Sequence, residues 1–290
     1  MHSPKQQNPD RPANERNILR ALIIDGQNNH EWRAVTPVLK EILSSTARFT
    51  VDVATTPPAD AAGESWQAFQ PAFGNFDVVV SNYFGEDWPA PTITALEQWV
   101  EDGGGYVVVH AGGTSFANRP SYNRMVGLAW REAIQGDRIA LDAASSVVRT
   151  PSGQGPATGH GPCFAFPICH HQPEHPVLRG LPQIWMHEKD ELWHGMRGPA
   201  ENLTVLASAF SPCTGAREPM LWTVRYGSGR VFVTALGHVW TPDDMAALTC
   251  VGFRDTLARG CQWAATGEVD LPLPTNFPAE GGISVGRVIY

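Results

Sequence analysis

The 290-residue sequence lacks the features that mark several common classes of protein. No apolar run approaches the roughly 18 residues that span a bilayer, and residues 1–17 have no apolar segment typical of a secretory signal. The five cysteines are an odd count without CxxC spacing, which indicates neither a disulfide framework nor a zinc knuckle. With a net charge of −8 and no Lys/Arg cluster, a nucleic-acid surface is not expected. These absences predict a cytoplasmic protein that binds neither membranes nor nucleic acid.

The composition favours a compact domain with many shaped loops. Hydrophobic residues make up 42% of the chain, which is enough for a core and excludes wholesale disorder. The 28 glycines and 24 prolines indicate many turns rather than a helical bundle. We expect a disordered segment over residues 1–17, one α/β domain over 18–267, and a tail over 268–290 that packs on the surface.

The first half of the chain has the pattern of a parallel sheet. Three apolar runs are typical of strands buried on both faces, and a fourth segment alternates as a strand does. Amphipathic helical spacing lies between them at residues 35–43 and 92–102. The predicted strands are Ile18–Ile24, Phe49–Val53, Phe76–Val80 and Tyr106–Val109. This order predicts a flavodoxin-like, doubly wound, mainly parallel α/β sheet with helices on both faces.

The second half is less regular. Residues 114–198 show no clear periodicity and are expected to be loop-rich. Strands are predicted at Leu203–Ala207, Met220–Tyr226 and Arg230–Ala235, the last two forming a hairpin across a Gly-Ser-Gly turn. A closing helix is predicted from Asp243 to about Ala265, because acidic residues favour a helix N-terminus.

Three histidines follow three of the predicted strands. His30 follows the first, His110 the fourth and His238 the late hairpin. Ligands of open parallel sheets bind beyond the carboxyl ends of the strands. Because three such placements exceed what chance easily gives, we expect these histidines to belong to a site.

His110 occupies a tight strand-to-helix elbow. The segment Val109-His110-Ala111-Gly112-Gly113 has small residues that let the apex side chain stand up at the sheet edge. A histidine there can act as a general acid or base, or as a metal ligand. The chain has no G-x-S-x-G, and no cysteine follows a predicted parallel strand, which argues against a serine hydrolase and a Cys-His amidase.

The densest titratable cluster lies at residues 185–194. Asp190 and Glu191 could supply a general base or hard-metal ligands, and Trp193 could stack on a sugar ring. The alternative interpretation is an exposed acidic loop. The HExxH spacing of zincin proteases is absent.

Several motifs in this order resemble one family. They are Asn29-His30, Gly103-Gly104-Gly105 leading into Val109-His110, His175 to Leu181, Asp190 to Trp193, and Tyr226 to Phe232 running on to Leu236-Gly237-His238. Over roughly residues 18–267 the chain resembles the ThuA-like (trehalose-utilisation) family, whose fold is similar to class I glutamine amidotransferases. The resemblance implies a role in carbohydrate catabolism around 3-keto derivatives of glycosides. The amidotransferase Cys-His-Glu triad does not carry over, because His110 stands at the elbow.

Two functions follow from these patterns. The first is an enzyme that acts on a sugar or 3-keto-glycoside by hydrolysis, elimination or isomerisation, and not as a glutamine amidotransferase. Glu191 or Asp190 and His110 would be base and acid, while His30 and His238 would polarise a carbonyl or, with His110, hold a divalent metal such as zinc. The substrate-binding candidates are Asn29, His30, Trp32, Tyr83, Trp193 and Trp240. The second function is a non-catalytic sugar-binding or interaction module. In either case the expected partner is a small carbohydrate. The sequence is also compatible with a homo-oligomer.

Overall fold

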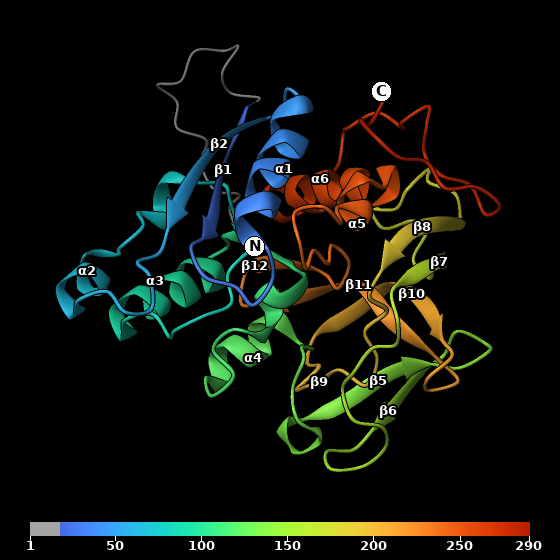
Figure 1. Ribbon diagram of the computed structural model, residues 1–290, viewed down its shortest axis with the longest axis horizontal. Coiled ribbons are helices and arrows are strands. Elements are labelled where there is room, and N and C mark those ends of the chain that lie inside the picture. The colour runs from blue at the N-terminus through green and yellow to red at the C-terminus, as the bar shows by residue number, and fades with distance from the viewer. Residues whose placement is uncertain (1–17) are drawn as a thin grey trace.

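The computed structural model describes residues 18–290, which form a large mixed sheet whose parallel half lies between layers of helices (Figure 1). The segment predicted to be disordered, 1–17, lies outside the described residues. The long path of the sheet runs in the order β2-β1-β3-β4-β12-β11-β10-β7-β8. It divides into a parallel half and an antiparallel half at the pair β12 and β11.

The parallel half confirms the predicted doubly wound fold. Its strands are β1 Leu19–Asp25, β2 Phe49–Thr55, β3 Val78–Ser81, β4 Gly105–Val109 and β12 Gly229–Thr234. All neighbouring pairs in this half are parallel. The four residues of β3 and the five of β4 are buried, as continuous apolar runs predict for strands covered on both faces.

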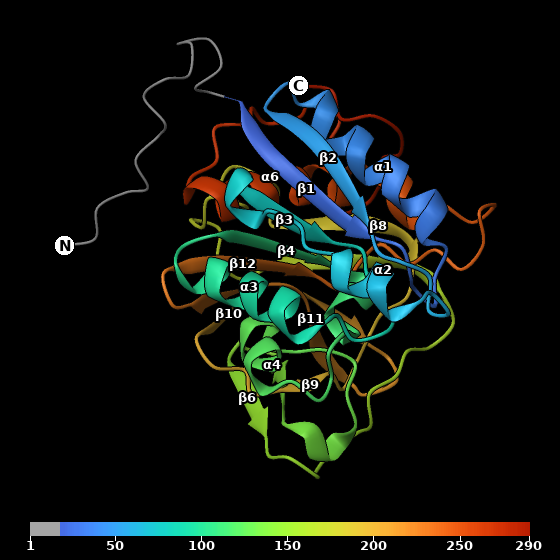
Figure 2. The same cartoon turned by 90° about the vertical axis from the view of Figure 1, so that its left-hand side faces the viewer.

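Helices cover both faces of the parallel half of the sheet (Figure 2). On one face α1 packs against α6, and on the other α3 contacts α4. The helices are α1 Trp32–Ser45, α2 Gly63–Ala68, α3 Ala90–Glu101, α4 Pro120–Val126, α5 Ala246–Thr249 and α6 Val251–Thr266, with 3-10 turns η1 Phe73–Asn75, η2 His110–Thr114 and η3 Ala133–Gln135. The prediction of one closing helix was wrong in part, because Cys250 is extended and separates α5 from α6.

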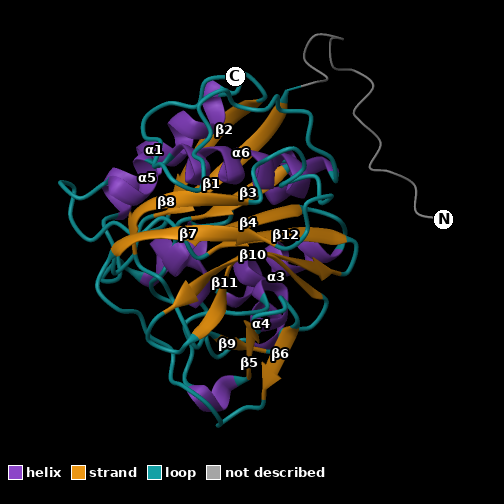
Figure 3. Cartoon of the chain, turned by 90° about the vertical axis from the view of Figure 1, so that its right-hand side faces the viewer, coloured by secondary structure: helices purple, strands orange, loops and turns teal. Residues whose placement is uncertain are grey.

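The antiparallel half contains strands that the sequence did not predict (Figure 3). Its strands are β5 Asp137–Leu141, β6 Val147–Thr150, β7 Phe164–His170, β8 Ile184–Asp190, β9 Arg197–Gly198, β10 Leu203–Ser211 and β11 Ala216–Tyr226. The strand β10 and the hairpin of β11 and β12 were predicted and are confirmed. Residues 114–198 thus form five strands rather than loops alone, and the pairing of β7 with β8 brings residue 190 to the sheet.

The C-terminal segment, 268–290, lies against the body of the protein. Val285 forms an isolated β-bridge with Cys250, and the side chain of Leu271 is buried. The terminal Tyr290 hydroxyl lies 3.4 Å from a carboxylate oxygen of Asp255 on α6. Asp255 is fully buried, and Nε of Arg259 lies 3.6 Å from its other oxygen. Burial raises the pKa of Asp255 to about 7, although Arg259 and Tyr290 act in the opposite direction.

We expect Asp255→Asn to change how stability depends on pH. The folded-state pKa of about 7 exceeds the ordinary value of 3.8, so the wild-type carboxyl contributes stability below about pH 4 that is lost as the pH rises through 7. Each unit of pKa shift corresponds to about 1.4 kcal/mol. Urea unfolding at pH 5 and pH 8 should show the asparagine variant gaining stability relative to wild type as the pH rises. A constant difference between the two proteins would contradict the assignment.

Candidate functional site

The three histidines expected at strand ends come together at one edge of the sheet. His30 follows β1, His110 directly follows β4 and His238 follows β12. The ring centroids of His30 and His110 are 4.8 Å apart, those of His30 and His238 5.0 Å, and those of His110 and His238 5.5 Å. The carboxyl ends of parallel strands lie at the same edge of a sheet, which explains how His30 and His238, 208 positions apart in sequence, become neighbours.

His110 stands on the predicted elbow in a strained conformation. Its φ of +46° lies in the left-handed region, which costs a non-glycine residue about 1–3 kcal/mol. Nδ1 donates to the carbonyl oxygen of Ala235 at 2.7 Å, which fixes the ring. A Cβ at Gly112 would come within 2.7 Å of the Ser81 carbonyl oxygen, so the elbow needs glycine there. The ring of His110 is 4% exposed, and its Nε2 has no hydrogen-bond partner.

His30 is oriented by its two neighbouring asparagines. Its Nδ1 lies 2.8 Å from Oδ1 of Asn29 and 3.2 Å from Oδ1 of Asn28. Because amide oxygens only accept hydrogen bonds, Nδ1 carries the proton and Nε2 keeps its lone pair. Burial, together with the nearby rings of His110 and His238, lowers the pKa of His30 to about 3.

Glu191 is the carboxylate on which the histidines converge. Its Oε1 lies 3.2 Å from Nε2 of His238 and 3.2 Å from Nε2 of His160, while Oε2 lies 3.6 Å from Nε2 of His110. The indole N–H of Trp193 donates to Oε2 at 2.8 Å. Burial by itself raises the pKa of Glu191, but His110, Trp193 and His238 together lower it to about 2.

Asp190, the other predicted carboxylate, is used within the fold. It accepts hydrogen bonds from the backbone N–H groups of Gly237 at 2.8 Å, His238 at 3.1 Å and Glu191 at 2.7 Å. It also pairs with the fully buried His187 at 2.7 Å. The alternative of an exposed acidic loop is thereby wrong for these two residues, since Asp190 and Glu191 are both buried. Asp190 fixes the turn that carries His238.

A hollow of about 360 Å³ opens over the cluster. Its lining residues are Asn29, His30, Phe84, Ala111, Thr114, Trp130, His160, Glu191, Trp193 and Trp240. Trp240 is 60% exposed and lies nearly parallel to the His238 ring, at 14°. Trp193 is instead buried beneath the hollow, with its ring centroid 4.4 Å from that of His110. The two tryptophans therefore play different parts, one at the rim and one in the floor.

Two of the predicted substrate-binding residues lie elsewhere. Tyr83 is fully buried and donates its hydroxyl to the backbone carbonyl oxygen of Glu86, so it presents no face to a ligand. Trp32 lines a neighbouring hollow that shares Asn29 with the first, and the Arg33 guanidinium lies 4.3 Å from its ring centroid. Because both residues follow predicted strands, we expected them near the histidines, but their side chains do not line the hollow over the cluster.

Three residues of the site were not predicted. His160 and Cys163 lie in the segment before β7, and Trp130 lies between α4 and η3. Sγ of Cys163 is 4.0 Å from Nδ1 of His238, and Nδ1 of His160 donates to the carbonyl oxygen of Gly161 at 2.7 Å. The only local signal was the pair of glycines around His160, which permits a sharp bend but does not say where it leads.

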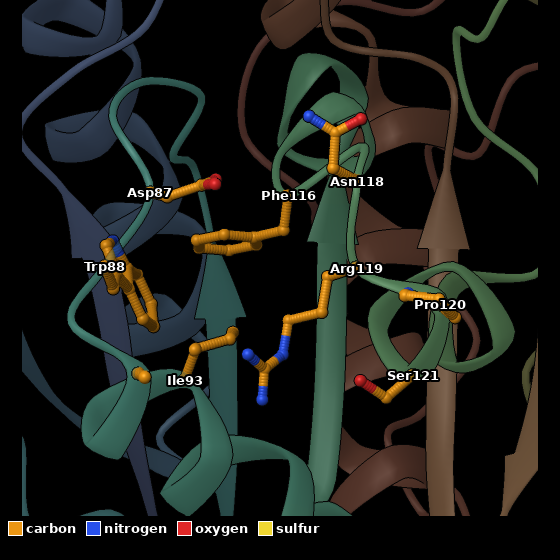
Figure 4. A pocket seen from close by; sticks show the side chains of 9 residues that line it. Asp87, Trp88, Ile93, Phe116, Asn118, Arg119, Pro120 and Ser121 are labelled. Carbon is orange, nitrogen blue, oxygen red and sulfur yellow. The ribbon is translucent and has the colours of Figure 1, made fainter.

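A larger hollow of about 490 Å³ lies beside α3 and α4 and does not include the cluster (Figure 4). Trp88, Phe116 and Arg119 point into it. The guanidinium of Arg119 is already paired with Glu97, at 2.6 and 2.8 Å. No histidine lines this hollow.

The fold and the cluster define a class: an amidotransferase-like α/β protein whose elbow carries histidine where an acyl-transfer enzyme would need a nucleophile. A family model described as "Trehalose utilisation" matches residues 20–264. The chain belongs to this ThuA family, as its motifs predicted.

Solved structures support the same assignment. A ThuA-like protein from Parabacteroides merdae is 36% identical, with a TM-score of 0.87 over 92% of this chain and 97% of that chain. A ThuA-like protein from Bacteroides uniformis is 16% identical, with a TM-score of 0.53 over 85% of this chain and 91% of that one, and shows the fold alone. No curated protein matches the chain. Among residues 18–290, no helix has both the length and the apolar character needed to cross a membrane.

We expect Asp190→Ala to unfold the site rather than only inactivate it. The substitution leaves His187 without its partner and removes the acceptor of three backbone N–H groups. Breaking such a buried pair costs about 3–5 kcal/mol. Urea unfolding measures the loss, with Glu188→Ala on the same strand as the matched control. A loss below about 1 kcal/mol, equal to that of the control, would contradict a scaffolding role.

Proposed function

We propose that the protein is an enzyme of carbohydrate catabolism. It would bind a sugar or 3-keto-glycoside above Glu191 and move a proton from one atom of that substrate to another. The family is described by trehalose utilisation, which points to a carbohydrate. The hollow of about 360 Å³ has the size of a sugar-ring site, with tryptophan at its rim. Tryptophan offers an apolar face and an N–H, a combination suited to a sugar ring.

The observation that carries the proposal is the convergence of four imidazole rings on one carboxylate. Glu191 is only 7% exposed, and burying a charge is costly unless it is paired. The strained backbone of His110 adds a further cost. A sugar-binding module needs hydrogen-bonding groups and a stacking surface, but not this concentration of titratable groups. Such clusters are typical of sites that move protons.

The proposed chemistry uses the acidity of a C–H beside a ketone. Glu191 and the two rings that contact its Oε1, those of His238 and His160, form the acid–base group, in which the carboxylate stabilises the imidazolium that arises when a ring accepts the proton. The enolate oxygen is stabilised by N–H donors of the site. Return of the proton to the neighbouring carbon isomerises the sugar, and its transfer to the glycosidic oxygen eliminates the aglycone. Addition of water to the elimination product completes a net hydrolysis.

Glu191→Gln is expected to lower turnover by about 10²–10⁴-fold, because the neutral amide no longer stabilises an imidazolium at the rings that contact it. Glu188→Gln, three residues away on β8, is the matched control and should retain wild-type turnover. The reaction is followed by NMR in D₂O, in which proton abstraction appears as deuterium on the carbon beside the ketone. Equal turnover in the two variants would exclude Glu191 from the chemistry.

Incubation of the wild-type protein with a panel of glycosides and their 3-keto forms tests the function itself. We expect at least one 3-keto-glycoside to be converted or to exchange deuterium. Saturation-transfer NMR on the same samples reports binding separately. Binding without conversion or exchange across the panel would contradict the enzyme and favour the sugar-binding module.

A further inference from the structure

Three potential ligands of a metal ion face one another beneath the hollow. One nitrogen each of His30 and His110 and one carboxylate oxygen of Glu191 all lie within 4.8 Å of one another. They come from the loop after β1, the elbow after β4 and the end of β8. We propose that His30, His110 and Glu191 bind one divalent first-row transition-metal ion. This set differs from the trio of histidines that the sequence suggested, because Glu191 takes the place of His238.

The two histidines are oriented as metal ligands are. In each ring Nδ1 donates to an oxygen acceptor, Asn29 Oδ1 for His30 and the Ala235 carbonyl oxygen for His110. Ligating histidines almost always donate their other N–H in this way, which fixes the tautomer and the direction of the free nitrogen. Nε2 of each ring is therefore the nitrogen left to coordinate an ion.

Nε2 of His110 provides an independent indication. It is buried, has no hydrogen-bond partner and lies 3.6 Å from Oε2 of Glu191, too far for a hydrogen bond. Buried polar atoms are rarely left without a partner. In a neutral ring whose proton is on Nδ1, the lone pair of Nε2 faces a carboxylate, which is repulsive. A cation between the two groups removes the repulsion and satisfies both.

His238 serves better as a support than as a ligand. Its Nε2 lies 3.2 Å from Oε1 of Glu191, the carboxylate oxygen turned away from His110. His160 contacts the same oxygen at 3.2 Å. These two rings hold the carboxylate in position while Oε2 faces His110.

Two imidazole nitrogens and one carboxylate oxygen suit zinc and other first-row divalent ions. Three protein ligands leave at least one coordination position open, and His30 and Glu191 both line the hollow. In that position the ion would polarise a sugar carbonyl or hydroxyl, a step that rests on the proposed function. Binding of the ion itself depends only on the three ligands.

The test is calorimetric titration of the full chain, purified without a polyhistidine tag and stripped with chelator, with Zn²⁺ and Mn²⁺ in the absence of sugar. We expect one equivalent of at least one ion to bind. His30→Ala should weaken that binding by about 100-fold or more, and Asn29→Ala by about 10-fold, since supporting groups contribute less than ligands. His175→Ala is the matched control, because this histidine packs on Trp263 outside the cluster, and it should bind as wild type does.

Circular dichroism confirms that each variant is folded, and His30 lies in a partly exposed loop where truncation leaves the core intact. Uptake below about a tenth of an equivalent by wild type would overturn the metal site. Equal binding by His30→Ala and His175→Ala would overturn it too, since the ion would then sit elsewhere. A chain that binds the ion but converts no glycoside leaves the metal site standing and contradicts only the proposed function. Full turnover without metal uptake would contradict the metal site and leave the proposed function standing.

Discussion

The carboxylate of Glu191 is the group on which the rest of the site depends. It is buried at the end of β8, and its two oxygens meet Trp193, His238 and His160, with His110 beyond. An unpaired anion in this place would be strongly destabilising, so the surrounding donors are a requirement of the fold as well as of the chemistry. The same donors keep the carboxylate charged and fixed in direction.

The adjacent carboxylates Asp190 and Glu191 have different roles: the first supports the fold and the second belongs to the site. Successive side chains of a strand point to opposite sides, and Asp190 and Glu191 lie at the point where β8 ends. Asp190 turns to His187 and to the backbone of the His238 turn, while Glu191 turns to the hollow. Because Asp190 bonds to the backbone N–H of both Glu191 and His238, it sets the relative position of a carboxylate and an imidazole from distant parts of the chain.

The sequence was informative where local pattern and topology agree. The apolar runs of β1, β3 and β4 are buried on both faces, so they could be recognised without any knowledge of their neighbours. The sites of His30, His110 and His238 followed, because parallel strands end at a common edge. The strands β7 and β8 could not be recognised, since β7 contains Pro167 and β8 carries four titratable residues among its seven. Pairing with β10 places β7 in the sheet, and pairing with β7 places β8; the first is a long-range contact that no local pattern reports.

The part of the site on that antiparallel half was correspondingly hard to predict. Nothing in the segment 185–194 distinguishes the carboxylate that faces the hollow from the one that supports the turn. His160 and Trp130 reach the hollow from irregular segments, whose paths depend on tertiary contacts. Tyr83 and Trp32 illustrate the opposite error, in which a correct place in the chain comes with a side chain that points elsewhere.

The central claim is that one carboxylate organises four imidazole rings, and ¹⁵N NMR of the histidine side chains tests it most directly. The account predicts that Glu191→Gln shifts the ring-nitrogen resonances of His30, His110, His160 and His238 together, while Glu188→Gln moves none of them. It also predicts Nδ1–H tautomers for His30 and His110, as their acceptors require. Four histidine spectra unchanged by Glu191→Gln would contradict the claim.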